Sequence, residues 1–298
     1  MTSTGLISAP APWDLTGKSW IVPIYTPFSE TPIPLPRGSY APLEKGSTCD
    51  QSDRFHGGCG VVMVLRYESS AVGPYDELIY IPGLFSRKST AGEKVKYHFS
   101  ITRIYVSEDV STINGRRNWS IPKHRASFKW SELPRGGTLV EVSHPTSPNS
   151  SFFRAVFSNS ALTPFAVPVS TSWFDWPIAR WLLSGYEGAI YQPSLTGVSE
   201  TSDRDKVEST KKTGQDLDAL VGSRHTYSLK PSSTGRSRIT TVEVAPSVEG
   251  KETEDWSEFG DGDGFPRFKP AKEGPLRGRG VHLTDIKMSF PLPVTVQE

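Results

Sequence analysis

Proline and glycine interrupt this chain at short intervals, and their spacing limits its fold more than any other feature of the sequence. The 298 residues include 26 glycines and 25 prolines. Proline removes a backbone donor and fixes φ, while glycine favours turns, so the composition argues against a helical bundle and favours a β-rich α+β fold. The hydrophobic fraction of 36% is enough for one large domain or two smaller ones, and we expect a single domain over residues 1–298.

Short runs of β-branched and aromatic residues between these turns predict strands. Residues 60–68 form the strongest run, and their continuous apolar sequence indicates burial on both faces. The other expected strands are residues 19–25, 75–82, 97–106, 126–130, 137–142, 151–157, 227–229, 238–244 and 281–290. The last of these could close the sheet that the first ones begin.

Two segments carry helical signals, and two others are polar. In residues 107–114 a serine precedes acidic residues, which predicts an N-cap and the first turn of a short helix ending near Gly115. Residues 173–183 place large apolar side chains at helical spacing, where they either fill a core or line a substrate pocket. Residues 1–20 are interpreted as a polar lead-in and residues 195–224 as a polar surface insert.

The charge balance restricts the classes of partner. Lys and Arg total 33 against 32 for Asp and Glu, so no overall positive field would attract nucleic acid or an anionic membrane. No apolar run is long enough for a membrane span or a secretory signal. We therefore expect a cytoplasmic protein with a small-molecule partner. Cys49 and Cys59 are too few for a disulfide framework and are interpreted as free thiols.

No metal or cofactor motif is recognisable. The Asp- and Gly-rich residues 260–266 lack the third alternating ligand and the distal glutamate of a calcium loop, so they predict a tight turn. The histidines form no i, i+4 ligand pair, and the chain has no phosphate-binding, dinucleotide-binding or nucleophile-elbow motif. The sequence therefore predicts neither a metal nor an organic cofactor.

Lys123 is the candidate nucleophile because Pro122 precedes it and His124 follows it. The proline gives the lysine a defined direction from the backbone. A lysine attacks a carbonyl carbon only when it is unprotonated, and burial or a neighbouring cation lowers its pKa. Apolar Trp119 and the adjacent His124 could supply these two effects.

Glu77 is the candidate acid. In a strand over residues 75–82, Glu77 shares a face with Ile79 and Ile81, while Asp76 lies on the other face, which is also apolar. One of the two carboxylates is therefore expected in the interior. An amine nucleophile and a carboxylate are the minimum requirement for Schiff-base chemistry on a ketone or β-keto acid.

The segment from Gly115-Arg116 to Pro122-Lys123 resembles the lysine motif of the acetoacetate decarboxylase family, most of all its members in filamentous fungi. The turn Gly73-Pro-Tyr75-x-Glu77 resembles the family's glycine, tyrosine and glutamate element. The resemblance implies a barrel or cone of mostly antiparallel strands, with a few short helices, that encloses a pocket. The site residues expected on these grounds are catalytic Lys123 and Glu77, supporting His124, Arg116 and Lys18, and the pocket residues Tyr75, Trp119 and Trp173.

The same resemblance implies a cofactor-independent carbon–carbon lyase. The leading hypothesis is a Schiff-base decarboxylase for a β-keto acid larger than acetoacetate, in secondary metabolism. A lysine-imine aldolase, dehydratase or cyclase and a non-catalytic small-molecule-binding protein are the alternatives. Characterised members of the family form large symmetric assemblies, so a homo-oligomer is compatible with the resemblance.

The chain departs from the family pattern at three positions. His124 replaces the second lysine, Arg117 replaces an acid, and Val62 falls where a second pocket glutamate would be. Lys123 is therefore expected to depend on burial more than on a charged neighbour. Arg116 either holds its loop or meets a substrate carboxylate.

Overall fold

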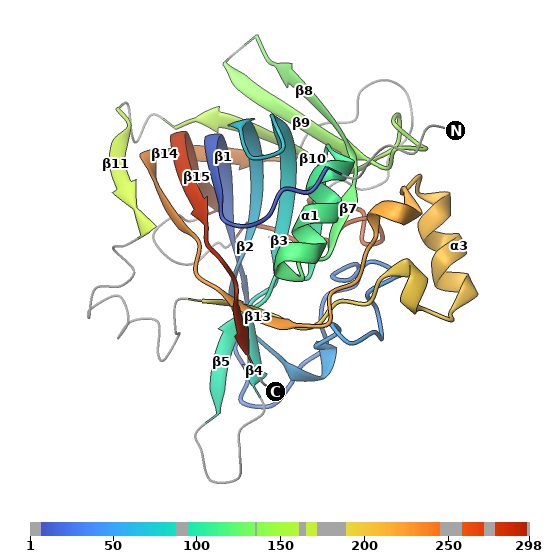
Figure 1. The fold of residues 1–298 in the computed structure, drawn as a ribbon. Helices are drawn as coiled ribbons and strands as arrows, with labels where there is room; N and C mark the ends of the chain where they lie inside the picture. Colours follow the sequence, from blue (N-terminus) through green and yellow to red (C-terminus); the bar gives the residue numbers. More distant parts are fainter. Residues whose placement is uncertain are drawn as a thin grey trace.

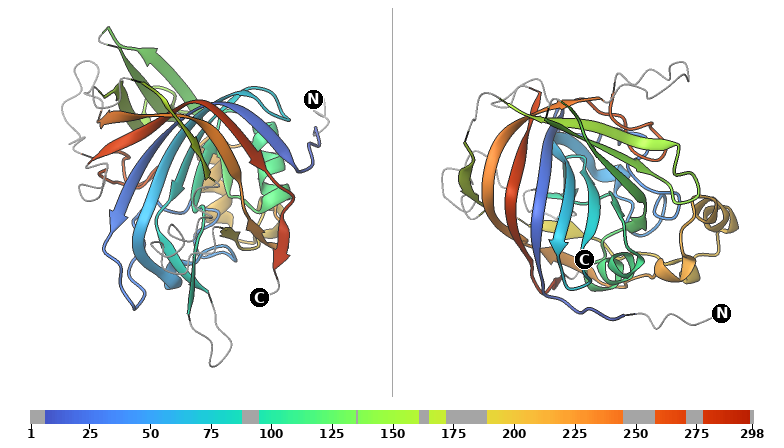
Figure 2. Two further views of the ribbon diagram at one scale, coloured as in Figure 1. Left: turned by 90° about the vertical axis from the view of Figure 1, so that its left-hand side faces the viewer. Right: turned by 90° about the horizontal axis from the view of Figure 1, so that it is seen from above.

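The computed structural model describes residues 7–87, 95–134, 136–160, 165–171, 189–244, 258–270 and 278–296. Strands dominate these residues and join in one large, strongly curved sheet (Figures 1 and 2). The strands are β1 (Trp13–Thr26), β2 (Phe55–Ser69), β3 (Tyr75–Ile81), β4 (Leu84–Arg87), β5 (Lys96–Phe99), β6 (Arg103–Val106), β7 (Lys123–Arg125), β8 (Ser127–Glu132), β9 (Gly137–Ser143), β10 (Ser151–Asn159), β11 (Val167–Ser170), β12 (Ile190–Gln192), β13 (Thr226–Leu229), β14 (Ser232–Glu243), β15 (Arg279–Phe290) and β16 (Val294–Val296). The described helices are α1 (Asp109–Trp119) and α3 (Arg204–Lys212), with the 3-10 turns η1 (Ser52–Arg54), η3 (Val198–Glu200) and η4 (Leu217–Ala219). The β-rich fold with few helices is therefore confirmed.

The main path through the sheet runs β16-β13-β12-β5-β4-β2-β1-β15-β14-β10-β9-β8. A second branch leaves β2 through β3 and β6 to β7. Most neighbours are antiparallel; the pairs β6–β7 and β5–β12 are parallel. The short parallel strand β7 carries the candidate lysine, so the branch positions the site.

The strands β1, β2 and β3 are covered by apolar layers on both faces. One layer packs against β8–β10 and contains Trp20, Val64 and Phe157. The other packs against α1 and contains Leu15 and Ile79. Alternation along each strand divides the side chains between the two layers, so the long apolar run of β2 is buried on both faces as predicted.

The polar lead-in is shorter than predicted, because β1 begins at Trp13. Trp13 and Leu15 are buried, whereas Asp14 and Thr16 are exposed between them. This alternation is typical of a strand with one buried face, and the polar half of the pattern concealed it. Residues 13–20 therefore belong to the sheet.

The strand expected over residues 97–106 is two strands with different partners. β5 pairs with β4, and β6 pairs with β3. Between them, buried Ser100 donates a hydrogen bond to Gln192 and accepts one from Gln51. These side-chain bonds replace the backbone ladder at the break.

Helix α1 also differs from the prediction at both ends. Ser107 does not cap it, because the Ser107 hydroxyl accepts a hydrogen bond from the backbone N–H of Asp76 on β3. The N-cap is Glu108, and the helix continues through Gly115 to Trp119. A glycine inside a helix usually has a packing reason, which the site supplies below.

Residues 195–224 are more than a surface insert. The polar middle forms α3, whose N-cap Asp203 accepts two backbone hydrogen bonds. Three of the segment's apolar residues, Leu195, Ala219 and Leu220, are buried. Both ends of the segment thus pack into the interior near α1, which is far away in the sequence. The polar composition of the segment did not reveal these contacts.

Further predictions concern a tight turn, the two cysteines, membrane-spanning helices and the helix expected near the middle of the chain. Asp261 accepts hydrogen bonds from the N–H groups of Asp263 and Phe265, as expected for a tight turn. Cys49 is buried and Cys59 exposed, and both are free thiols. Among the described residues, no helix is long and apolar enough to cross a membrane. The helix expected over residues 173–183 lies outside the described residues.

Candidate active site

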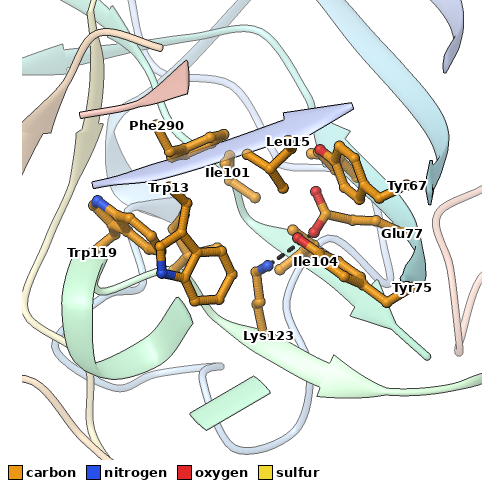
Figure 3. A pocket seen from close by; sticks show the side chains of 12 residues that line it. Trp13, Leu15, Tyr67, Tyr75, Glu77, Ile101, Ile104, Trp119, Lys123 and Phe290 are labelled. Atoms are coloured by element: carbon orange, nitrogen blue, oxygen red, sulfur yellow. Dashed lines mark hydrogen bonds and ion pairs between the residues drawn. The ribbon is translucent and has the colours of Figure 1, made fainter. Parts of the chain in front are cut away.

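The sheet brings Lys123 and Glu77 together from positions 46 residues apart in the sequence. Pairing of β7 with β6 sets Lys123 beside Ile104, and pairing of β3 with β6 sets Glu77 beside Val106. Lys123 Nζ then lies 2.8 Å from Glu77 Oε2 (Figure 3). The two residues are only 4% and 2% exposed. The carboxylate predicted to enter the interior is therefore Glu77.

The remaining contacts of the lysine come from α1 and two aromatic rings. Lys123 Nζ lies 3.1 Å from the hydroxyl of buried Ser111. It also lies 5.2 Å from the ring centroid of Tyr75 and 6.0 Å from that of Trp13, both within cation–π range. An ammonium group is thus surrounded by one carboxylate, one hydroxyl and aromatic faces.

A small cavity adjoins the pair and is mostly apolar. Its lining comprises Trp13, Leu15, Tyr67, Tyr75, Glu77, Ile79, Ile101, Ile104, Trp119, Ile121, Lys123 and Phe290. Its volume of about 20 Å³ is enough for about one water molecule. Trp13 and Phe290 each pack edge-on against Trp119, at 5.1 and 5.4 Å between ring centroids (Figure 3). A substrate therefore enters only when side chains of the lining move.

Gly115 makes room for the lysine side chain. A Cβ atom at this position would lie 2.4 Å from Lys123 Cδ and 2.7 Å from Cε, far inside van der Waals contact. The aliphatic part of Lys123 therefore lies directly on the backbone of α1. This contact is the packing reason for a glycine in the middle of the helix.

The two tyrosines beside Glu77 are held in their protonated form. Burial, reinforced by the charge of Glu77, raises the pKa of both Tyr67 and Tyr75 well above its ordinary value. Figure 3 shows both rings next to the Glu77 carboxylate. At neutral pH these phenols are uncharged, so Lys123 and Glu77 carry the charge of the lining.

Glu44 forms a second buried ionic group behind the lysine, and the sequence patterns did not indicate it. One Glu44 oxygen accepts a hydrogen bond from Arg116 at 2.8 Å, and the other contacts His124 Nε2 at 2.8 Å. Burial alone would raise the pKa of Glu44, but His124 and Arg116 lower it to about 2. Glu44 is therefore a carboxylate that links α1 to β7.

Arg116 is fully buried and holds backbone from several segments. Its guanidinium donates to the carbonyl oxygens of Val221 at 2.8 Å, Thr196 at 3.1 Å and Lys123 at 3.2 Å, in addition to Glu44. Of the two predicted roles, the structure shows the structural one. Because the guanidinium is occupied by these acceptors, it does not face the cavity.

His124 does not have the predicted role beside the lysine nitrogen. It follows Lys123 in a strand, so its side chain points to the opposite face, where it contacts the ring of Tyr105 and bonds to Glu44. Burial lowers the pKa of His124 despite the opposing effect of Glu44. His124 therefore supports Glu44 and does not approach the Lys123 nitrogen.

The other predicted residues divide into two groups. Tyr75 and Trp119 line the cavity beside Lys123. Lys18 is exposed on β1, beside Arg66 of β2, and does not reach the cavity. Trp173 lies outside the described residues. The supporting role expected for Lys18 is therefore wrong, because its side chain lies on the other face of the sheet.

Sequence patterns could have revealed some of the residues that were missed. Ser111 lies four positions before Gly115, so a helix puts both on the face toward Lys123. Trp13 belongs to an alternating pattern. Glu44, by contrast, follows a proline-rich connection without periodicity, and no local signal indicates its burial.

Comparisons with known proteins bear on the fold. No family model matches the chain, and no curated protein matches it. The structure is similar to acetoacetate decarboxylase from Legionella pneumophila, with 10% identity, a TM-score of 0.50, and coverage of 100% of this chain and 92% of that chain. The enduracididine biosynthesis enzyme MppR, solved with a condensation product of pyruvate and imidazole 4-carboxaldehyde, gives 11% identity, 98% and 92% coverage, and a TM-score of 0.49. An acetoacetate decarboxylase-like enzyme from Sphingomonas wittichii gives 10% identity, 100% and 98% coverage, and a TM-score of 0.45.

The chain therefore has the acetoacetate decarboxylase-like fold, as the two motifs predicted. At these identities the likeness establishes the fold alone. The chemistry of this chain has to be argued from its own side chains.

Proposed function

We propose that this protein is a cofactor-independent lyase in which Lys123 forms a Schiff base with a carbonyl substrate. The observation that carries the proposal is the 2.8 Å contact between buried Lys123 and Glu77 in an otherwise apolar cavity. Burial of an ion pair costs free energy, because both groups lose their hydration, so a buried pair that served no function would be unfavourable. A lysine on the wall of a cavity, with its proton held by one carboxylate, is suited to act as a nucleophile.

The pair can generate the free amine by an internal proton transfer. The ammonium of Lys123 passes a proton to Glu77, which replaces two buried charges by a neutral amine and a carboxylic acid. In an apolar cavity this neutral pair competes with the ion pair far better than it would in water. Burial and the partner Glu77 thus activate Lys123 in place of the second lysine of the family pattern, which this chain lacks.

Imine formation then follows, and Glu77 gives up the proton that it received from Lys123. The amine lone pair attacks the carbonyl carbon, and a proton moves from nitrogen to oxygen to give the carbinolamine. Glu77 protonates the departing hydroxyl, and water leaves. The product is an iminium on Lys123 with Glu77 again a carboxylate, so the total charge of the site is unchanged.

We propose decarboxylation of a β-keto acid as the first candidate for the step that follows. Electrons of the bond to the carboxylate move to the iminium nitrogen, and carbon dioxide leaves. Glu77, a carboxylate after imine formation, takes up one proton from solvent and passes it to the enamine carbon. The shared fold supports this reaction, and we place the substrate among small keto compounds of secondary metabolism, in the cytoplasm. Because the cavity has a volume of about 20 Å³, its side chains must move for any keto acid to enter, acetoacetate included.

An aldolase, dehydratase or cyclase is the second candidate, since the same iminium serves all three. Its support is that Val62 lies in the apolar layer on the opposite face, so among the described residues of the lining only Glu77 is a carboxylate. A non-catalytic binding protein is the third candidate and would leave the lysine unreacted.

Reductive trapping separates these candidates. The protein is incubated with a panel of β-keto acids and simple ketones, reduced with borohydride and measured by intact mass. We expect one adduct on the wild type and on Lys129→Ala, whose lysine is exposed on β8, and none on Lys123→Ala. Release of carbon dioxide with the adduct indicates decarboxylation, and an adduct without release indicates the second candidate. If no carbonyl compound is trapped, the Schiff-base function is wrong.

A further inference from the structure

We infer that the cavity accepts a carbonyl substrate only when the substrate, the protons bound with it and the lining residues together carry no net charge. Uncharged ketones and aldehydes enter directly, whereas a keto acid enters together with one proton. The inference rests on the proposed imine chemistry of Lys123 and adds the substrate class of the same site.

The charge count of the lining is the first step. Of the twelve lining residues, Lys123 and Glu77 carry opposite charges, and Tyr67 and Tyr75 are protonated phenols. The other eight are aliphatic residues, tryptophans and a phenylalanine. The empty site is therefore neutral, whether its proton lies on the lysine or on the glutamate.

No further cation is available among the described residues around the lining. The guanidinium of Arg116 is bonded to Glu44 and to three carbonyl oxygens. His124 faces away from the cavity and bonds to Glu44, and Lys18 is exposed on another face. None of the three supporting residues predicted from the sequence, Arg116, His124 and Lys18, therefore lies in the described lining of the cavity.

The elements packed against Glu77 likewise bring no second cation of the described residues to its carboxylate. Strand β2 presents Tyr67, β6 presents Ile104, and α1 presents Ser111, while β7 presents Lys123 itself. Arg66 and Asp76 pair with each other on the opposite face of the sheet. A substrate carboxylate in the cavity would therefore meet Glu77 and no described second cation.

The balance of the reaction shows what each substrate class requires. A neutral ketone gives an iminium and a Glu77 carboxylate, which sum to zero. A keto acid adds one negative charge, and burial of an uncompensated charge in an apolar site is strongly unfavourable. The complex becomes neutral when Glu77 takes up one proton. Decarboxylation of a β-keto acid consumes one proton at the enamine carbon, so the proton that enters with the acid is the one the reaction uses.

The test compares a stable keto acid with its ester. The wild type is incubated at low concentration with 4-oxopentanoate or its methyl ester in the presence of cyanoborohydride, and adducts are counted by intact mass from pH 6 to pH 8. Uptake of one proton predicts a ratio of ester to acid adducts that rises tenfold per pH unit, about 100-fold over the range. The ratio cancels the pH dependence of the reductant and of Lys123.

The variant Glu77→Gln checks the origin of this ratio. The amide keeps the shape of the side chain but removes one negative charge, so the acid no longer needs a proton and the ratio should become independent of pH. Asp76→Asn, one residue away on the opposite face, should keep the rising ratio. Circular dichroism confirms that each variant is folded.

Three outcomes would overturn the inference. A constant ratio in the wild type, or a preference for the acid at pH 8, shows that an anion is accommodated and leaves the imine function intact. A rising ratio that persists in Glu77→Gln shows that another group takes up the proton. Trapping of neither compound rejects the imine function itself and the inference with it.

Discussion

Replacement of Gly115 by alanine should disable the lysine while leaving the fold in place. The new Cβ atom would lie 2.4 Å from Lys123 Cδ, whereas ordinary contacts begin near 3.4 Å. The lysine side chain must therefore move by about 1 Å, because the helix backbone on the other side is fixed by its hydrogen bonds. Lys123 Nζ then loses its positions at 2.8 Å from Glu77 and 3.1 Å from Ser111.

The magnitudes of the two effects differ. A displacement of about 1 Å from a productive geometry costs about 100-fold in rate. Stability should change little: alanine gains about 1 kcal/mol over glycine in a helix, and the overpacked contact costs about 1–3 kcal/mol. We therefore expect trapping to slow by about 100-fold with a loss of stability of at most about 2 kcal/mol.

The assay measures the rate of reductive trapping with one ketone and the unfolding midpoint in urea. Arg117→Ala is the matched control, because it lies on the same helix with an exposed side chain. It should trap at the wild-type rate. If Gly115→Ala also traps at that rate, either the position of Lys123 does not matter or Lys123 is not the reacting group.

Two further predictions concern the buried polar groups. Glu44→Gln leaves Arg116 without its counterion, which should lower the free energy of unfolding by about 3–5 kcal/mol in urea titrations; an unchanged value, equal to that of the exposed control Glu30→Gln, would contradict the role of Glu44. Acid should also destabilise the protein, because burial lowers the pKa of His98 to about 3, so only the unfolded chain binds this proton between pH 6.5 and 3. Stability present above pH 6.5 is lost as the pH falls through this window. His98→Gln should reduce the loss between pH 7 and pH 5, and an identical loss would refute the assignment.

Much of the sheet was predictable because strand formation depends on local patterns. The run at residues 60–68 and the alternation at Glu77 both gave the correct burial, since successive side chains in a strand point to opposite faces. The errors occurred where tertiary contacts override local signals. Ser107 bonds to β3 instead of capping α1, and α1 continues through Gly115, where the absence of a Cβ leaves room for Lys123.

The candidate site shows the same division. Pro122-Lys123 and Glu77 could be selected from residue type and spacing, but their 2.8 Å contact depends on the pairing of β3, β6 and β7. Glu44 could not be selected, because its burial depends on Arg116 and His124 from distant parts of the chain. Residues 173–183, which include Trp173, lie outside the described residues.

The sequence by itself determined that this chain is β-rich, that it carries one directed lysine, and that one carboxylate of the second strong strand enters the interior. Periodicity and proline geometry act within a few residues, so they can be read without a structure. Only the tertiary structure decided which charges share the cavity. It placed Lys123 with Glu77 and turned Arg116 and His124 toward Glu44, because the direction of a side chain across a sheet depends on strand register and on partners far along the chain.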